Sequence, residues 1–478
     1  MQYREMITDK PREECGICGI FGHPEAAKLA YLALYALQHR GQEGAGIVAA
    51  DGAALRVHKG EGLVADVFGP SALDGLPGHI AIGHVRYSTT GASHLRNVAP
   101  FTGRRADGGW VAVAHNGNLV NAPRIKLGLE QRGVAFESTT DSEGIMHAIR
   151  LAAGATLAEQ AVEGLAELQG AFSLAIMSEQ ALVAARDSNG FRPLCLGRLK
   201  GGGYAVASES CAFDLIEAEY VRDVEPGEVL EVSASGLRSL RPFPPARQSS
   251  CIFEFIYFSR PDSTVFNAPV HVVRKELGRQ LAWEAPAAGD VVVPVPDSGN
   301  VAAMGYADVS RIPYELGLVR NHYVGRTFIE PSQAIRDFGV KIKLNPVKSV
   351  IAGKRVILVD DSLVRGTTMR KICKMVKQAG AKEIHVRISS PPHRSPCYYG
   401  IDFPTSKELI ATTHSKEEIR RFIGVTTIEY ISLEGLLKAV RNVSAGFCLA
   451  CFDSRYPVLP ADLMSKDALE RASIGSPA

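Results

Sequence analysis

The chain has 478 residues, of which 46% are hydrophobic and 22% are charged. That length argues for two or three globular domains, and that composition excludes a disordered chain. The formal net charge of +2 provides no broad basic surface, so nucleic acid is not expected as a partner. No apolar run approaches the ~18 residues of a membrane helix, and the leader MQYREMITDKPREE has no apolar core. We therefore expect a cytoplasmic protein without a membrane partner.

The first half of the chain combines strand-like and helical segments. Stretches rich in β-forming residues at 79–88 and 110–120 predict strands, and the alanine-rich segment 26–38 predicts a helix. This mixture is typical of a layered α+β domain. Residues 234–250 then collect Ser, Pro and Arg without apolar periodicity, so we place a domain junction there.

The second half alternates short apolar runs with helical patterns. The runs VVVPVP at 291–296, VILVD at 356–360 and IHVRI at 384–388 predict strands. Their alternation with helices predicts a mostly parallel sheet with crossover connections. Between the last two runs, one helical face carries Met369, Ile372, Met375, Val376 and Ala379, and Gly380 marks the expected end of the helix.

Nine cysteines in a large chain without a secretion signal indicate metal binding or catalysis rather than disulfides. Cys15, which follows the leader, has two interpretations. It is either a small hydrophobic residue buried in a strand, or a new N-terminal residue after removal of residues 1–14. Only the rest of the chain decides between them.

A C-x-x-C pair, Cys448 and Cys451, lies near the C-terminus and fits zinc, a redox pair or chance. Together with Cys251 and Cys397 this pair would provide four thiolates. Such a set suits either Zn²⁺ or a [4Fe-4S] cluster, because ligand identity does not separate the two.

The string VILVDDSLVRGTT places Asp360 and Asp361 at the end of a buried strand, before a Gly-Thr-Thr turn into a helix. Backbone N–H groups, the hydroxyls of Thr367 and Thr368 and the positive helix end would hold a phosphate. The two acids suit ribose hydroxyls or a Mg²⁺ ion. The alternative is a tight turn with a helix cap.

The wider string closely resembles the signature of the type I phosphoribosyltransferases, whose substrate is 5-phosphoribosyl 1-diphosphate. The resemblance implies that Asp360 and Asp361 face the ribose and the metal. It also implies that the 5-phosphate is held by residues 362–368, among them Ser362, Arg365, Gly366, Thr367 and Thr368.

Two further segments belong to the same pattern. By the family resemblance, Ser298 in VPVPDSGNVAAMGYA lies near the metal, although a plain Pro-Asp turn before a helix is the alternative. The polar segment YVGRTFIEPSQAIRDFGVKIKL is too long for a simple connection and is typical of a lid or a disordered loop. Arg326, Lys341 and Lys343 in it suit contacts with the diphosphate; the alternative is that they are solvated basic residues.

Four short strings in the first half carry the residues of a second chemistry. Arg40 lies in LQHRGQEGAG, Arg86 in GHVRYSTTG, Asn116 and Gly117 in AHNGNLVN, and Asp141 in STTDSE. Taken singly, they fit a surface ion pair, a turn and a helix start. Combined with Cys15, they resemble the N-terminal-nucleophile glutamine amidotransferases.

That resemblance implies a role for each residue. The free α-amine of Cys15, with a pKa near ~7.7–8.0, would act as base for its own thiol, which requires removal of the leader. Asn116 and Gly117 would stabilise the oxyanion. Arg86 would bind the α-carboxylate of glutamine and Asp141 its α-amine, and the pattern includes Arg40 among the glutamine-binding residues.

From residue 15 to about residue 455, the chain resembles the iron-sulfur, leader-processed subgroup of the amidophosphoribosyltransferase family, through IYFSRPDS, PYELGLVRN, VDDSLVRGTT and CLAC. The resemblance implies an α+β N-terminal-nucleophile (αββα) glutaminase domain at 15–245 after a removed leader. An α/β type I phosphoribosyltransferase domain follows at 246–440, and then a C-terminal segment, 441–478. It assigns the cluster to Cys251, Cys397, Cys448 and Cys451, and packing roles to Cys18, Cys195, Cys211 and Cys373.

The implied reaction transfers the amide nitrogen of glutamine to 5-phosphoribosyl 1-diphosphate, giving 5-phosphoribosylamine, diphosphate and glutamate, the first committed step of de novo purine synthesis. One Mg²⁺ and one [4Fe-4S] cluster per subunit, a homotetramer and feedback inhibition by purine nucleotides are also implied. Two other functions are possible for a chain with some of these motifs. A hexosamine synthase would carry a sugar-isomerase repeat in place of VDDSLVRGTT, and a non-catalytic sensor should lack the cysteine or its arginine.

Overall fold

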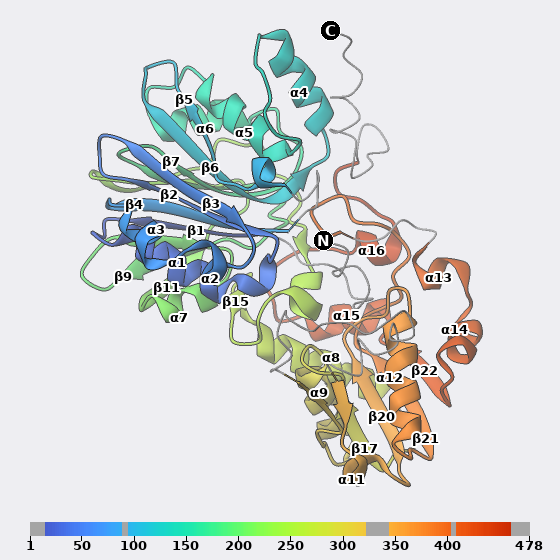
Figure 1. Ribbon diagram of the computed structural model, residues 1–478. Coiled ribbons are helices and arrows are strands. Elements are labelled where there is room, and N and C mark those ends of the chain that lie inside the picture. Colours follow the sequence, from blue (N-terminus) through green and yellow to red (C-terminus); the bar gives the residue numbers. More distant parts are fainter. Residues whose placement is uncertain (1–14, 88–93, 322–343, 403–407, 460–478) are drawn as a thin grey trace.

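The computed structural model describes residues 15–87, 94–321, 344–402 and 408–459. The leader 1–14 and the predicted diphosphate-binding residues Arg326, Lys341 and Lys343 lie outside these ranges. Figure 1 shows a first domain of packed sheets and a second domain built on a smaller sheet. No helix in the described parts is both long and apolar enough to cross a membrane.

Two antiparallel sheets form the first domain. Within the described residues, the first sheet has seven strands in the order β11 (Ala218–Asp223), β9 (Cys195–Leu199), β10 (Tyr204–Ala207), β1 (Gly16–Phe21), β4 (Ile80–Arg86), β2 (Gly44–Ala50) and β3 (Leu55–Glu61). The second has six, in the order β13 (Gly236–Leu240), β12 (Val229–Ser233), β8 (Leu182–Arg186), β7 (Gly170–Met177), β6 (Trp110–Leu119) and β5 (Phe101–Arg104).

The two sheets pack face to face over a common apolar core. Ile17, Ile82 and Val48 of the first sheet share this core with Ala114 and Leu230 of the second. Strands such as β2 and β4 are buried along their whole length, because one face meets the other sheet and the opposite face meets helices.

Helices cover the outer faces of both sheets, as Figure 1 shows. The alanine-rich α1 (Ala26–Ala36) and α7 (Cys211–Leu215) pack on the first sheet, and α5 (Asp141–Arg150) and α6 (Leu157–Leu165) on the second. The layers therefore follow the predicted αββα order, which is confirmed. Shorter helices are η1 (Gln38–Arg40), α2 (Val64–Val67), α3 (Pro70–Asp74), η2 (Leu95–Asn97) and α4 (Ala122–Gln131).

The second domain is built on a parallel sheet, as predicted. Its strands in the described residues follow the order β17 (Val291–Pro294), β20 (Arg355–Asp360), β21 (Glu383–Ile388) and β22 (Thr427–Tyr430). One face is covered by α8 (Val270–Glu284), α9 (Asn300–Ser310) and α15 (Leu433–Ala439), and the other by α11 (Lys348–Ile351), α12 (Thr367–Gln378) and α14 (Lys416–Ile423).

Helices α8 and α9 lie unusually close together because each presents a glycine to the other. A Cβ at Gly278 would lie 1.8 Å from the carbonyl oxygen of Ala302, and one at Gly305 would lie 1.9 Å from that of Lys275. No side chain fits in such a gap. This packing fixes the helix layer behind β17 and β20.

Short elements join the domains and the C-terminal segment. Strand β14 (Ser250–Cys251) pairs in parallel with β23 (Phe447–Cys448), and η3 (Glu254–Phe258), a π-helix, follows β14. The remaining elements are β15 (Thr264–Val265), β16 (Ala268–Pro269), β18 (Leu318–Arg320), β19 (Leu344–Pro346), α13 (Ile410–Thr413) and α16 (Ala450–Asp453). The last described strand of the first domain ends at Leu240, while the exact domain boundaries stay predictions.

Candidate active sites

Cys15 lies directly before β1 and is half-buried. Its Sγ donates a hydrogen bond to the carbonyl oxygen of Tyr87 at 3.4 Å. Burial raises the pKa of the thiol to about 11, although the Tyr87 carbonyl and Arg86 act in the opposite direction. At neutral pH the sulfur therefore keeps its proton, and it needs a nearby base to act as a nucleophile.

A cation and an anion flank this thiol. Arg86 ends β4 and Asp141 begins α5; both are buried, and both act on the charge of Cys15. Burial raises the pKa of Asp141, but His115 at 3.7 Å and the N–H of Leu119 outweigh it and hold that pKa below its usual value. Asp141 is therefore ionised beside a permanent guanidinium. Such a pair suits the two charged groups of an α-amino acid.

Strand β6 carries the two residues predicted to stabilise an oxyanion. Asn116 is fully buried, and neither side-chain polar atom has a hydrogen-bond partner among the described residues. A buried amide without partners is rare in native proteins and calls for a ligand or a water molecule. Gly117 has φ +146°, and a Cβ there would lie 2.1 Å from the carbonyl oxygen of Ala171, so this position requires glycine.

The side chain of Arg40, predicted to bind glutamine, extends toward two glutamates. All three nitrogens of its buried guanidinium are engaged: Nε donates to Glu209, Nη1 to Glu254 at 3.3 Å, and Nη2 to Glu254 and Ser259. The predicted contact with glutamine would require these bonds to break. The structure instead places this side chain in an ion-pair network between the domains.

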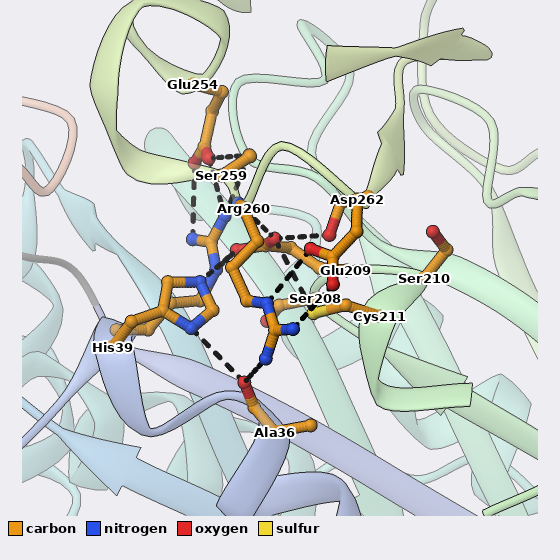
Figure 2. A network of polar contacts seen from close by, with 12 residues as sticks. Ala36, His39, Ser208, Glu209, Ser210, Cys211, Glu254, Ser259, Arg260 and Asp262 are labelled. Atoms are coloured by element: carbon orange, nitrogen blue, oxygen red, sulfur yellow. Dashed lines mark hydrogen bonds and ion pairs between the residues drawn. The ribbon is translucent and has the colours of Figure 1, made fainter. Parts of the chain in front are cut away.

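Figure 2 shows this network, with Glu209 and His39 from the first domain near Glu254 and Ser259 from the second. Burial raises the pKa of Glu209, but Arg40 and His39 hold it well below its usual value. The sequence analysis missed both glutamates. One signal was present for Glu254, which is the only charged residue in the run CIFEFIYF and so needs a buried partner.

The predicted phosphate loop follows β20 as expected. Asp360, Asp361 and Ser362 are buried at the carboxyl end of the strand; the N–H of Asp361 donates to Asp360 Oδ1 at 2.9 Å, and the Ser362 hydroxyl donates to Asp361. Gly366, with φ +77°, is the N-cap of α12, so the positive N-terminal end of a twelve-residue helix faces this loop. Thr367 and Thr368 form its first turn.

Ser298 lies in a turn at the same edge of the sheet. The N–H of Val295 donates to the carbonyl oxygen of Val359 at 2.8 Å, and a Cβ at Gly299 would lie 2.5 Å from that oxygen. The turn therefore sits directly beside the last residues of β20. Arg365 is exposed and pairs with Glu408 at 3.0 Å. Ser298, the two acids and the phosphate loop thus meet at one edge, where ligands of open α/β sheets bind.

Arg274, a residue the sequence analysis missed, connects η3 with this edge. From α8 its buried guanidinium donates to the carbonyl oxygens of Phe255, Tyr257 and Ser259 at 2.6–2.7 Å. Burial lowers the pKa of Arg274 to about 10, and the charge of Asp361 opposes that shift. No pattern in the sequence distinguishes this arginine from Arg279, the exposed arginine of the same helix.

The four predicted cluster cysteines line one cavity. Cys251 pairs with Cys448 across β14 and β23, and Cys397 and Cys451 face the same space. In the described parts of the chain, no three His, Cys, Asp or Glu side chains group closely enough for a single metal ion. The sulfurs of a zinc site lie about 3.8 Å apart at Zn–S distances of 2.3 Å, whereas a cluster binds each thiolate through a different iron. Four thiolates around one cavity suit either zinc or a [4Fe-4S] cluster, as predicted from the sequence.

The other cysteines are packing residues, as predicted. Cys18, Cys195, Cys211 and Cys373 are buried in the apolar cores of the two domains.

Comparisons with known proteins agree with these two sites. Residues 93–214 match the glutamine amidotransferase domain family, and residues 275–391 match the phosphoribosyl transferase domain family. The chain is 51% identical to the amidophosphoribosyltransferase of Bacillus subtilis (strain 168), covering 93% of this chain and 94% of that protein. It is also 51% identical to the chloroplastic amidophosphoribosyltransferase 1 of Arabidopsis thaliana, covering 98% and 83%.

A solved structure gives the same result. The glutamine phosphoribosylpyrophosphate amidotransferase of B. subtilis, described as complexed with ADP and GMP, superimposes with a TM-score of 0.90 at 49% identity. The match covers 95% of this chain and 100% of that one. Because about half of the residues are identical over nearly the full length of these relatives, the chain belongs to the amidophosphoribosyltransferase family.

Proposed function

We propose that this chain transfers the amide nitrogen of glutamine to 5-phosphoribosyl 1-diphosphate, as the names of its relatives state for them, giving 5-phosphoribosylamine, diphosphate and glutamate. This places the chain at the first committed step of de novo purine synthesis. One observation carries the proposal. The chain combines a thiol flanked by an arginine and an aspartate with a buried diacid and phosphate loop at a sheet edge.

The first half of the reaction occurs at Cys15 after residues 1–14 are removed. The new α-amine takes the thiol proton, and the sulfur attacks the side-chain amide carbon of glutamine. Asn116 and the N–H of Gly117 stabilise the oxyanion of the tetrahedral intermediate. The amine then returns the proton to the leaving nitrogen, which departs as ammonia, and water hydrolyses the thioester to glutamate.

Glutamine is held by the two charges beside the thiol. Arg86 binds its α-carboxylate and Asp141 its α-amine, and the depressed pKa of Asp141 keeps that carboxylate charged. Arg40 has no such role in this proposal, because its guanidinium is already bound to Glu209 and Glu254.

The second half occurs at the carboxyl edge of β20. Residues 362–368 bind the 5-phosphate, Asp360 and Asp361 bind the ribose hydroxyls, and Arg326 and Lys343 bind the diphosphate. Ammonia attacks C1 of the ribose, and the C1–O bond to diphosphate breaks. One Mg²⁺ per subunit, near Ser298 and the two acids, would neutralise charge on the leaving diphosphate when bound.

The remaining assignments concern the cluster and the assembly. We propose that Cys251, Cys397, Cys448 and Cys451 hold one [4Fe-4S] cluster per subunit; when bound, it would link β14, β23 and the segment around Cys397. The active protein is a cytoplasmic homotetramer. Purine nucleotides inhibit it, a proposal supported by the nucleotides named for the related B. subtilis structure.

The variant Cys15→Ser tests the division of labour. Glutamine-dependent synthesis should fall by at least about 1,000-fold, because a hydroxyl is a much weaker nucleophile. Synthesis from high ammonium at alkaline pH should match wild type, and a melting temperature equal to that of wild type serves as the control for folding. A folded variant that fails equally with both nitrogen donors would contradict the proposal.

A further inference from the structure

A loop of the second domain, Cys397–Gly400, lies directly on the strand that carries the predicted oxyanion residues. Asn118 Nδ2 donates to the carbonyl oxygen of Tyr398 at 3.0 Å. Gly400 has φ +112°, and a Cβ there would lie 3.2–3.3 Å from the backbone carbon, Cα and oxygen of Gly117. The loop therefore packs closely against Gly117 and accepts a hydrogen bond from the next residue, Asn118.

Several buried interactions with the first domain hold this loop in place. The guanidinium of Arg192, which is fully buried, donates to the carbonyl oxygen of Tyr399 from Nε at 2.9 Å and from Nη2 at 2.7 Å. The ring of Tyr399 stacks on Phe191 with centroids 4.1 Å apart. Tyr399 and Phe191 also form one apolar cluster with Val120 and with Ala171, which pairs with Asn118 across β6 and β7.

Gly117 is consequently confined from two directions. The carbonyl oxygen of Ala171 lies on one side, where a Cβ at Gly117 would come within 2.1 Å, and on the other side a Cβ at Gly400 of the second domain would come within 3.2–3.3 Å of the Gly117 backbone. Stabilisation of an oxyanion depends on donors held 2.7–3.1 Å from the developing charge, so a small rotation of this peptide would reduce the rate. The placement of the Gly117 backbone thus depends in part on how closely a residue of the other domain packs against it.

We infer that Gly400 and the Asn118–Tyr398 bond are positioning elements for the oxyanion hole, through which the second domain sets the rate of glutamine hydrolysis without touching the thiol. This inference rests on the proposed roles of Cys15 and Gly117. It assigns to the Cys397–Gly400 loop a function in the first site, although the loop belongs to the second domain.

The variants Gly400→Ala and Asn118→Ala test the inference in the full-length enzyme. Each should lower kcat for glutamine hydrolysis by about 10- to 100-fold, because a displaced donor stabilises the transition state less. KM for glutamine should stay within about twofold, since Arg86 and Asp141 are untouched. Synthesis from ammonium and the rate of Cys15 alkylation by iodoacetamide should equal those of wild type.

Gly353→Ala is the matched control. Gly353 lies in the second domain with φ +74°, and a Cβ there meets no atom within 4 Å, so the substitution places a methyl group on a positive-φ residue away from the loop. Its kcat for glutamine should be unchanged. If Gly400→Ala does not fold, the kcat of Asn118→Ala for glutamine hydrolysis is sufficient to test the inference.

Two results would overturn the inference. One is an unchanged kcat for glutamine in Asn118→Ala; the other is an equal loss of glutamine- and ammonium-dependent synthesis, which would indicate general destabilisation. Failure of the proposed function would give a different result from failure of this inference. The wild-type enzyme would then hydrolyse no glutamine, or the Cys15→Ser variant would still hydrolyse it.

Discussion

The ion-pair network between the domains is testable through Glu254, a fully buried residue of the second domain. Its carboxylate accepts hydrogen bonds from Arg40 and Ser259, and Arg192 Nη1 lies 3.6 Å from Oε1. Glu254→Gln keeps the size of the side chain and one acceptor oxygen but removes its charge. Removing one partner of a buried ion pair lowers the free energy of unfolding by about 3–5 kcal/mol. Because glutamine keeps one acceptor oxygen, we expect a loss near the lower value for this variant.

Thermal unfolding followed by calorimetry measures the effect. At roughly 2–4 °C per kcal/mol for domains of this size, a loss of about 3 kcal/mol lowers the melting temperature by about 6–12 °C. Glu434→Gln is the control, because Glu434 forms an exposed i,i+4 pair with Lys438 and its loss should leave the melting temperature unchanged. Equal melting temperatures for Glu254→Gln and wild type would refute the role of the network.

The same network predicts a pH dependence. Burial raises the pKa of Glu254, but Arg40 and Arg192 outweigh it and leave that pKa below its usual value. A depressed folded pKa stabilises the protein above the unfolded value of about 4.3, and this stabilisation is lost as the pH falls through the folded value. The difference in melting temperature between wild type and Glu254→Gln should therefore be largest at pH 7. It should decrease below about pH 4, where Glu254 of the wild type becomes protonated and loses its charge.

Three further outcomes are expected. Intact mass should show that the active protein begins at Cys15, and full activity with residues 1–14 still present would contradict the terminal-amine mechanism. Asp361→Asn should abolish synthesis with either nitrogen donor while glutamine hydrolysis persists without a response to phosphoribosyl diphosphate; normal synthesis would place that site elsewhere. Cys448→Ser should lose iron and sulfide together with most folded protein, because site formation and folding are coupled, whereas stoichiometric zinc in anaerobically purified wild type would exclude the cluster.

Elements with a strong local pattern were predictable from the sequence. The predicted helical face Met369, Ile372, Met375 and Val376 is buried in α12, and Gly380 after the helix has φ +98°. The phosphate loop was predictable for the same reason, since strand, acids, glycine and helix follow one another within a dozen residues. A pattern confined to consecutive residues is readable from the sequence without knowledge of distant contacts.

The hydrogen-bond partners of Arg40 were not predictable from the sequence. Its partners Glu209 and Glu254 lie 169 and 214 residues away in the sequence. No periodicity or spacing relates positions so far apart, and the string LQHRGQEGAG fits a glutamine ligand and a buried ion pair equally well. Only the folded structure distinguishes the two, because folding places the carboxylates of Glu209 and Glu254 within hydrogen-bond distance of the Arg40 guanidinium.

The contacts between the domains bear on why the two activities occur in one chain. Glu254 neutralises Arg40, and a Cβ at Gly16, the residue after Cys15, would lie 3.3 Å from the Cβ of Arg40. The carbonyl oxygen of Tyr399 accepts from the buried Arg192. Without the second domain, Arg40 and Arg192 would exchange these acceptors for water, and Gly117 would lose the packing of Gly400. The second domain therefore completes the hydrogen bonding of two arginines of the glutaminase half and packs beside its predicted oxyanion residue.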